Sequence, residues 1–194
     1  MSNQDNEEYM LNHRAFVLLG LVAEIPSYAY NINQRIEERG MRDWTNIGKS
    51  SIYNIITKLE EDGLVESYIE EVDNRIRKIY TITDYGSEIL RNKAYNVISE
   101  FIGKNDEDFY VAFSMLPILT KKQQIDAITK SLKKIKTHQR ELERMLEEIS
   151  HMPLNVRGLF VHPIKILGID IEFLEWALKE IQKGGEKESW PKSI

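Results

Sequence analysis

Apolar residues follow a helical period through the first part of the chain. Helices are expected at residues 10–24 and 28–39, which Pro26 and Gly40 close, and a loop is expected at residues 41–47. In the next helix apolar residues stand at i, i+3, i+4 and i+7, which is the spacing of one buried face, and a glycine after Asp62 stops the helix. The four apolar positions are Ile52, Ile55, Ile56 and Leu59.

Two strand-like segments follow this helix, at residues 64–71 and 76–83, with a turn expected at residues 73–74 between them. Thr83 is a suitable N-cap for a further helix at residues 84–102. Three helices followed by a β-hairpin is the order of a winged helix-turn-helix. In that fold one helix enters a DNA groove, and the hairpin can contact the neighbouring phosphate backbone.

The outward face expected for the third helix is rich in hydrogen-bond donors and carries no acidic residue. Together with the basic start of the second strand it predicts a DNA-binding surface, because short polar groups suit base edges and lysines suit phosphates. Solvated helix surface is the alternative for each of the short polar residues, Ser50, Ser51, Asn54 and Thr57. The alternative for Tyr53 is a place in the core, and for Arg77 it is a cross-strand ion pair with Glu66 or Glu70. The candidate DNA-binding residues are Lys49, Ser50, Ser51, Tyr53, Asn54, Thr57, Lys58, Arg75, Arg77 and Lys78.

The second half of the chain has helical patterns and no strand pattern. A short helix is expected at residues 106–116, and Thr120 with Gln123 forms the capping-box sequence of a long helix. That helix and the last one carry heptad seams, which predict pairing with a second copy of the chain. Pro163, inside the second seam, is expected to mark the first turn of the last helix or a kink. The predicted dimer interface consists of Ile125, Ile128, Leu132, Ile135, Gln139, Leu142, Leu146, Ile149, Ile164, Leu167, Ile171, Leu174, Leu178 and Ile181.

Several large aromatic residues are candidates for an effector cavity at the dimer interface. Core and dimer packing is the simpler explanation for each of them, since large aromatic side chains dominate both. The sequence therefore leaves the effector-binding residues unknown. The aromatic candidates are Trp44, Phe109, Phe113, Phe160, Phe173 and Trp176.

Composition narrows the range of functions. The chain has 194 residues, 42% of them hydrophobic and 29% charged, and no cysteine, which excludes disulfides and thiolate chemistry. It has no histidine pair at i, i+4, no Gly-rich phosphate loop and no nucleophile elbow, so we expect no metal, no cofactor and no catalysis. No apolar run approaches a membrane span and the start lacks a signal-peptide pattern, so a cytoplasmic protein without membrane contact is expected.

The charge balance complicates the DNA-binding prediction. The formal net charge is −5, and residues 1–92 hold 10 basic and 16 acidic residues, against 16 and 15 in residues 93–194. A local basic patch matters more for phosphate contact than net charge does. The acidic first half nevertheless favours an alternative, a winged-helix interaction module that binds a protein partner rather than DNA. A dimer that sequesters a small ligand is a third hypothesis.

Three segments of the first half carry a more specific pattern. They read FVLLGLVAEIPSYAYNINQRIEERG at residues 16–40, SSIYNIITKLEEDGLVES at residues 50–67 and RKIYTITDYG at residues 77–86. Together they resemble the PadR family of bacterial transcriptional regulators. The all-helical second half resembles the dimerisation domain of that family. In this sequence Ala29-Tyr30 replaces the family's usual Gly-Tyr, and Lys49 adds a long donor at the start of the third helix.

The resemblance implies a mainly α fold with a small β-wing. A winged helix-turn-helix DNA-binding domain is expected at residues 10–103 and an all-helical dimerisation domain at residues 104–183, between a disordered tail at 1–9 and a flexible tail at 184–194. The implied function is that of a sequence-specific regulator, most simply a repressor, bound as a homodimer to an inverted-repeat operator in double-stranded DNA and open to relief by a small aromatic effector. Tyr53 matches the family's recognition-helix tyrosine, whose hydroxyl is expected to reach a phosphate.

Overall fold

A computed structural model describes residues 9–45, 47–72, 75–103 and 106–184. It is mainly α-helical with a two-stranded antiparallel sheet, as the sequence predicts. The chain forms two compact units, which divide inside one long helix after Lys93. The two tails, apart from their innermost residues, and the predicted hairpin turn lie outside the described residues.

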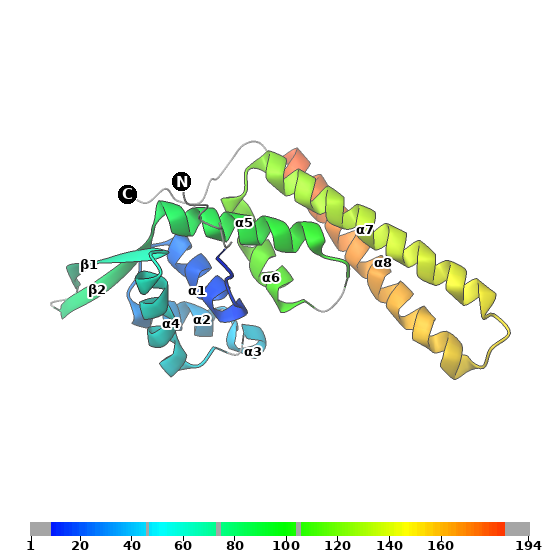
Figure 1. Ribbon diagram of the computed structural model, residues 1–194, viewed down its shortest axis with the longest axis horizontal. Coiled ribbons are helices and arrows are strands. Elements are labelled where there is room, and N and C mark those ends of the chain that lie inside the picture. The colour runs from blue at the N-terminus through cyan, green and yellow to red at the C-terminus, as the bar shows by residue number, and fades with distance from the viewer. Residues whose placement is uncertain (1–8, 46, 73–74, 104–105, 185–194) are drawn as a thin grey trace, which may run out of the picture. The chain divides into compact units, whose positions relative to one another are not determined.

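The first unit begins with the helices α1 (His13–Glu24), α2 (Ala29–Glu38), α3 (Arg42–Thr45) and α4 (Lys49–Glu61) (Figure 1). The sequence predicted α1, α2 and α4. It predicted a loop where α3 lies, and that prediction is wrong. A helix of about one turn is too short to show a hydrophobic period, which is why it was missed.

Helix α1 forms the centre of this unit. It begins where the Oδ1 of Asn12 accepts a hydrogen bond from the amide of Ala15 at 3.0 Å, a typical N-cap contact. Its following residues are buried on all sides, and a helix that is apolar all round belongs in a core. Helix α4 packs on α1 through three residues of the predicted apolar face, which are Ile52, Ile56 and Leu59.

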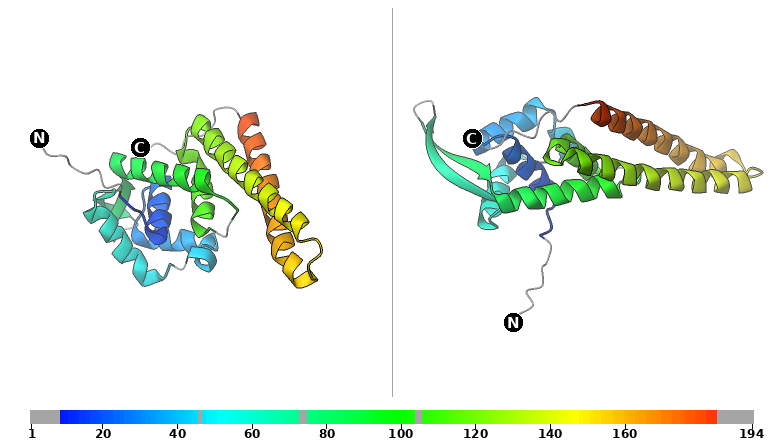
Figure 2. Two further views of the ribbon diagram at one scale, coloured as in Figure 1. Left: turned by 45° about the vertical axis from the view of Figure 1, so that its right-hand side comes forward. Right: turned by 90° about the horizontal axis from the view of Figure 1, so that it is seen from above.

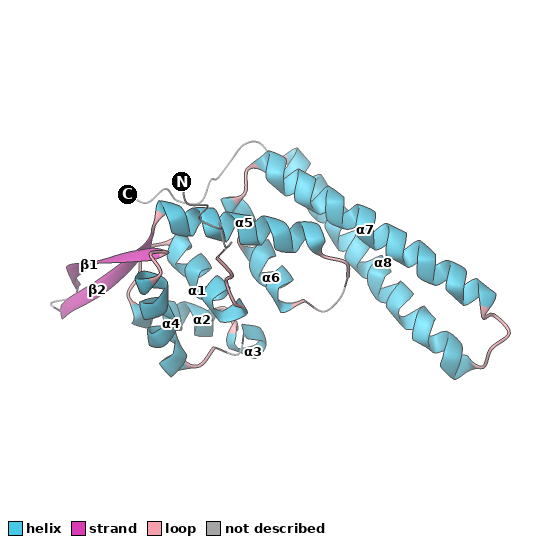
Figure 3. Ribbon diagram, in the orientation of Figure 1, coloured by secondary structure: helices cyan, strands magenta, loops and turns pink. Residues whose placement is uncertain are grey.

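The wing consists of β1 (Val65–Val72) and β2 (Arg75–Ile82), and Figure 3 shows it as the magenta hairpin that projects beyond the helices of this unit. The strands pair antiparallel along their whole lengths, so that the first residue of β1 lies opposite the last residue of β2. Two backbone hydrogen bonds of 3.0 Å join Ser27 to Tyr80. This bridge attaches β2 to the segment before α2 and so fixes the wing beside that helix.

Helix α5 (Asp84–Glu100) follows the wing and begins at the predicted N-cap, where the Oγ1 of Thr83 accepts a hydrogen bond from the amide of Gly86 at 2.9 Å. It ends two residues before the predicted end, and the division between the two units falls inside it rather than at residue 103. Gly86 approaches the backbone of Leu64 so closely that an added Cβ would lie 2.0 Å from the Leu64 carbonyl oxygen.

We expect Gly86→Ala to lower the free energy of unfolding by about 2 kcal/mol or more, because the new methyl group overlaps a backbone atom that cannot easily move. Thermal unfolding followed by circular dichroism measures this effect. Gly158→Ala is the matched control, since an added Cβ at Gly158 meets nothing within 4 Å. Equal melting temperatures for the two variants would mean that α5 does not approach Leu64 as described.

The second unit contains the end of α5, α6 (Glu107–Ser114), a short 3-10 helix η1 (Leu116–Ile118), α7 (Lys121–Glu148) and α8 (Leu154–Lys183). Helices α7 and α8 form a long hairpin and lie side by side in every view (Figure 1, Figure 2). No helix in the described part of the chain is long and apolar enough to cross a membrane.

The starts of the two long helices bear on the sequence predictions. Helix α7 has the predicted capping box, in which the Oγ1 of Thr120 accepts from the Gln123 amide and the Gln123 side chain accepts from the Thr120 amide. Helix α8 begins at Leu154, so Pro163 lies well inside it. The expectation that Pro163 marks the first turn is therefore wrong.

Much of the predicted dimer seam is buried inside one chain. The Nε2 of Gln139 donates a hydrogen bond to the backbone carbonyl of Ile164 at 3.2 Å, which joins α7 to α8. The buried seam residues are Ile128, Leu132, Ile135, Leu167 and Leu174. Their own chain already covers these residues, and their contact with a second chain stays a prediction. The other seam residues are half-buried and stay predictions: Ile125, Leu142, Leu146, Ile149, Ile164, Ile171, Leu178 and Ile181.

Candidate nucleic-acid interface

The outward face of α4 presents the donors that the sequence predicted. Its apolar face is fixed in the core, which turns the polar side chains to solvent. Tyr53 is 58% exposed. Ser51 differs from the prediction, since it is half-buried and its Oγ donates to the Gly48 carbonyl at 2.7 Å. The exposed candidates on α4 are Lys49, Ser50, Tyr53, Asn54, Thr57 and Lys58.

The basic start of β2 lies on the wing. Arg75 and Lys78 are exposed, and Arg77 is half-buried. The guanidinium of Arg77 lies 4.0 Å from the centre of the Tyr28 ring, a distance suited to a cation–π contact. In the strand register Arg77 stands opposite Glu70. The ring contact fixes the guanidinium beside the start of α2.

A cavity of about 600 Å³ lies between the start of α2, the outward face of α4 and the first half of β2. The Tyr28 and Tyr30 rings at its edge are nearly parallel, with an angle of 8° between their planes. None of the described residues that line the cavity is acidic. A concave surface of tyrosines and cations suits the sugar–phosphate backbone of a nucleic acid. The tyrosine and basic lining residues are Tyr28, Tyr30, Tyr53, Tyr80, Arg75, Arg77 and Lys78.

Three of the candidate lysines form ion pairs with carboxylates of the same unit. The sequence gave no sign of these pairs, which depend on the folded chain. Each amine lowers the pKa of its partner carboxyl, mainly through their hydrogen bond. The pairs are Lys49 with Glu37 at 3.2 Å, Lys58 with Asp62 at 2.7 Å and Lys78 with Glu60 at 2.7 Å.

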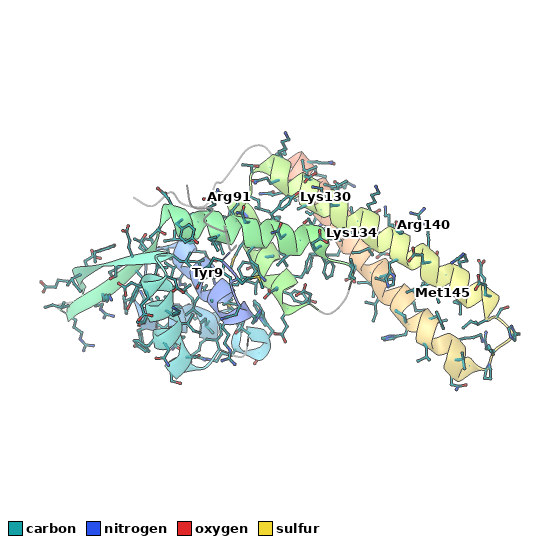
Figure 4. The ribbon with its side chains drawn as sticks, in the orientation of Figure 1. Tyr9, Arg91, Lys130, Lys134, Arg140 and Met145 are labelled. Atoms are coloured by element: carbon teal, nitrogen blue, oxygen red, sulfur yellow. The ribbon has the colours of Figure 1, made fainter. Side chains whose placement is uncertain are left out.

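Tyr9 adds a contact that the sequence did not predict. Its hydroxyl donates a hydrogen bond to the Oδ2 of Asp62 at 2.5 Å, and Figure 4 labels its side chain. Burial, followed by the bond to Asp62, raises the pKa of Tyr9 to about 12. The segment before α1 therefore reaches the C-terminal end of α4 and holds one of the carboxylates near the candidate surface.

A second candidate surface lies on α8 in the helical unit. Among the exposed large apolar residues of α8, four follow a heptad-like spacing, and the stripe that they form differs from the seam that the sequence predicted. Ile169 is 67% and Trp176 is 56% exposed. Exposed apolar stripes of this kind often mark contact surfaces. We call these residues the α8 stripe: Leu159, Ile166, Ile169 and Trp176.

Most of the predicted effector aromatics form one cluster in the helical unit. The rings of Phe113 and Phe173 have centroids 4.9 Å apart, and Phe109 and Trp176 both lie beside Phe173. Trp44 is on α3 of the other unit. The cluster explains these residues as packing without identifying an effector cavity.

A separate groove of about 700 Å³ lies between the end of α5 and α7. Figure 4 labels Lys130 and Lys134, which line it. Lys130 pairs with Asp126 at 2.9 Å and Lys134 pairs with Glu100 at 2.5 Å. Because both amines are already paired, the groove does not identify an effector. Among the described residues there is also no group of three metal-ligating side chains.

The order of elements in the first unit, helices followed by a two-stranded wing, is that of a winged helix-turn-helix. Residues 18–92 match the family model described as the transcriptional regulator PadR-like family. The chain belongs to the PadR-like family of transcriptional regulators. No match is found among curated proteins.

Several solved structures are similar to this chain, and they include the following three. Smu.1704 from Streptococcus mutans UA159 is 32% identical, over 42% of this chain and 74% of its own, with a TM-score of 0.36. Bacillus subtilis PadR in complex with operator DNA is 20% identical, over 86% of this chain and 98% of its own, with a TM-score of 0.40. Bacillus subtilis PadR in complex with p-coumaric acid is 19% identical, over 89% and 100%, with a TM-score of 0.38. These TM-scores are low, so the family assignment rests on the sequence matches.

Proposed function

We propose that the protein binds a specific operator in double-stranded DNA through α4 and the wing. The observation that carries this proposal is the outward face of α4 beside a cavity lined by tyrosines and cations. Helix α4 would enter the major groove, where its short polar side chains reach base edges. The Tyr53 hydroxyl and Arg77 would contact phosphates at the cavity. Bacillus subtilis PadR in complex with operator DNA supports this assignment.

The proposed operator is an inverted repeat that binds a homodimer. Two copies related by a twofold axis would place their α4 helices in successive major grooves, about 34 Å apart along the duplex. The α8 stripe supports a dimer, because its apolar residues lack cover and their heptad-like spacing suits pairing with a second copy. A dimer bound over a promoter would block access to it, so repression is the simplest outcome.

A small aromatic effector is the proposed means of release. Bacillus subtilis PadR in complex with p-coumaric acid supports a ligand of this class. In this chain Trp176, at the exposed edge of the aromatic cluster, offers a ring on which such a ligand could stack. An effector that binds one arrangement of two protomers better than another would shift the spacing of the α4 helices and weaken operator binding.

We expect the purified protein to bind a duplex from its own promoter region with two protomers per duplex. The logarithm of the association constant should fall against the logarithm of the salt concentration with a slope of about −4 or steeper, because several phosphate contacts release counterions from the DNA. Fluorescence anisotropy over a salt series measures the slope, and a scrambled duplex of equal length is the control. Equal affinity for the two duplexes would contradict operator recognition.

A protein partner is the second candidate function. The acidic excess of residues 1–92 favours it, with 10 basic against 16 acidic residues. Binding of such a partner through apolar contacts would change little with salt, whereas binding to phosphates would weaken steeply. Measuring affinity over a salt series, once for the duplex and once for a captured protein partner, therefore separates the two functions.

A further inference from the structure

Three carboxylates at the candidate DNA surface bind the same lysine amines that DNA phosphates would bind. Glu37 comes from α2, Glu60 from the last turn of α4 and Asp62 from the C-cap of α4, and each lies within 3.2 Å of a candidate lysine. We propose that these three carboxylates act as internal substitutes for DNA phosphate, so that the lysines reach a duplex only when its phosphates displace them. This proposal rests on the proposed function in DNA binding.

Each carboxylate has a second donor besides its lysine. A side chain held in this way stays where it is when the lysine leaves, so a displaced amine uncovers a carboxylate close to the incoming phosphate. The carboxylates therefore weaken DNA binding in two ways. Their ion pairs with the lysines must first be broken, and their negative charges then repel the phosphates of the bound duplex. The second donors are Arg42 for Glu37 at 3.2 Å, Ser67 for Glu60 at 2.5 Å and Tyr9 for Asp62 at 2.5 Å.

The charge state supports the same conclusion. Hydrogen bonds from the lysines lower the pKa of all three carboxyls, so they are ionised at neutral pH. Exposed ion pairs are individually weak, which lets phosphates replace them. A duplex offers a row of phosphates that can replace all three at once, whereas a single small anion replaces one. The arrangement therefore favours extended polyanions over isolated anions.

The expected consequence is weak non-specific binding. Displacing the carboxylates costs the same on every sequence, and at a random site phosphate contacts alone must offset that cost. At the operator, base contacts add to them. The protein would then spend little time on random DNA. An acidic winged helix can still serve as a DNA-binding domain in this way, because its carboxylates weaken non-specific binding while the base contacts at the operator remain.

Neutral variants test the proposal on the full-length protein. We expect Glu60→Gln to tighten binding of the promoter duplex about two- to fivefold at low salt, and Glu37→Gln/Glu60→Gln/Asp62→Asn to tighten it about tenfold or more. The gain should shrink as salt rises, because exposed ion pairs are screened. Glu66→Gln on β1 is the matched control, since Glu66 is exposed and has no ion pair with another described residue. It makes the same charge change and should give a clearly smaller gain.

A double-mutant cycle separates displacement of a partner from general repulsion. In a Lys78→Gln background the amine that Glu60 holds is gone, so Glu60→Gln should give no more than the gain of Glu66→Gln. An equal gain from Glu60→Gln in both backgrounds would overturn the proposal, because the carboxylate would then act only through its charge.

The outcomes for the two proposals are distinct. If neither the natural protein nor the triple variant binds any duplex, the proposed DNA function fails and this inference fails with it. If the natural protein binds its operator and the triple variant binds no more tightly, only the inference fails. Binding by the triple variant alone would support the inference, since the carboxylates would then mask the surface completely.

Discussion

We expect Tyr53→Ala and Arg77→Ala each to weaken binding of the promoter duplex about tenfold or more, and the two changes together to weaken it about 100-fold, because each would remove a proposed hydrogen bond to a charged phosphate. Tyr53 is 58% exposed, so its removal should leave the melting temperature unchanged. Arg77 also stacks on Tyr28 at 4.0 Å, so its variant is checked by circular dichroism before affinity is compared. Fluorescence anisotropy on the same duplex gives the affinities.

Two conservative variants sharpen this prediction. Tyr53→Phe keeps the ring and removes only the hydroxyl, so it should show most of the loss if the phosphate contact is the main contribution. Arg77→Lys keeps the charge but removes the planar guanidinium, which can stack on a ring and donate two hydrogen bonds to one phosphate. Its affinity should therefore lie between those of the natural protein and Arg77→Ala. Tyr110→Ala is the matched control, because Tyr110 is an exposed tyrosine on α6 of the helical unit. Unchanged affinity in both alanine variants would remove α4 and the wing from the DNA interface.

The orientation of α4 could be predicted from the sequence because a helix repeats every 3.6 residues. Once Ile52, Ile56 and Leu59 occupy the core, the position of Tyr53 outside the buried face follows from the helix geometry alone. The strands of the wing were predicted to within one residue for the same kind of reason, since β-branched and aromatic runs bounded by turn residues are typical of a hairpin. Local periodicity therefore predicted where the donors lie.

The ion pairs on this surface could not be predicted in the same way. Lys78 and Glu60 are eighteen positions apart in the sequence, and their 2.7 Å contact exists only because β2 folds back beside the end of α4. The periodic spacing of apolar residues along a helix or strand does not indicate which distant residues will form such pairs. The DNA-binding surface predicted from the sequence was therefore more basic than the one in the structure, where three lysines are neutralised by near neighbours.

The heptad seam was ambiguous for a different reason. A stripe of apolar residues on a helix needs a partner helix, but its period is the same whether that partner belongs to the same chain or to another. In this protein α7 and α8 form a hairpin, so residues such as Ile128 and Leu174 are buried within one chain. The exposed α8 stripe lies on other positions of α8, and it is therefore the better candidate for the proposed dimer interface.

Ile169→Glu/Trp176→Glu is therefore expected to give monomers, with an apparent dissociation constant raised about 100-fold or more, because charged groups would have to enter an apolar contact without partners. Under twofold symmetry each added carboxylate is brought close to its own copy, which adds repulsion. Both residues are more than half exposed in the single chain, so helix content and melting of the monomer should be preserved. Sedimentation velocity measures the oligomeric state. Affinity for the full operator should fall with it, since a monomer contacts one half-site.

Leu132→Glu is the variant that separates the two seams. Leu132 is buried inside the single chain, so a glutamate there should destabilise the helical unit by several kcal/mol and show as a lowered melting temperature. The α8 variant should instead change the oligomeric state with little change in the melting of the monomer. If the α8 variant stayed dimeric while Leu132→Glu gave folded monomers, the interface would lie on the seam predicted from the sequence, and α7 and α8 would have to separate in the dimer to expose it.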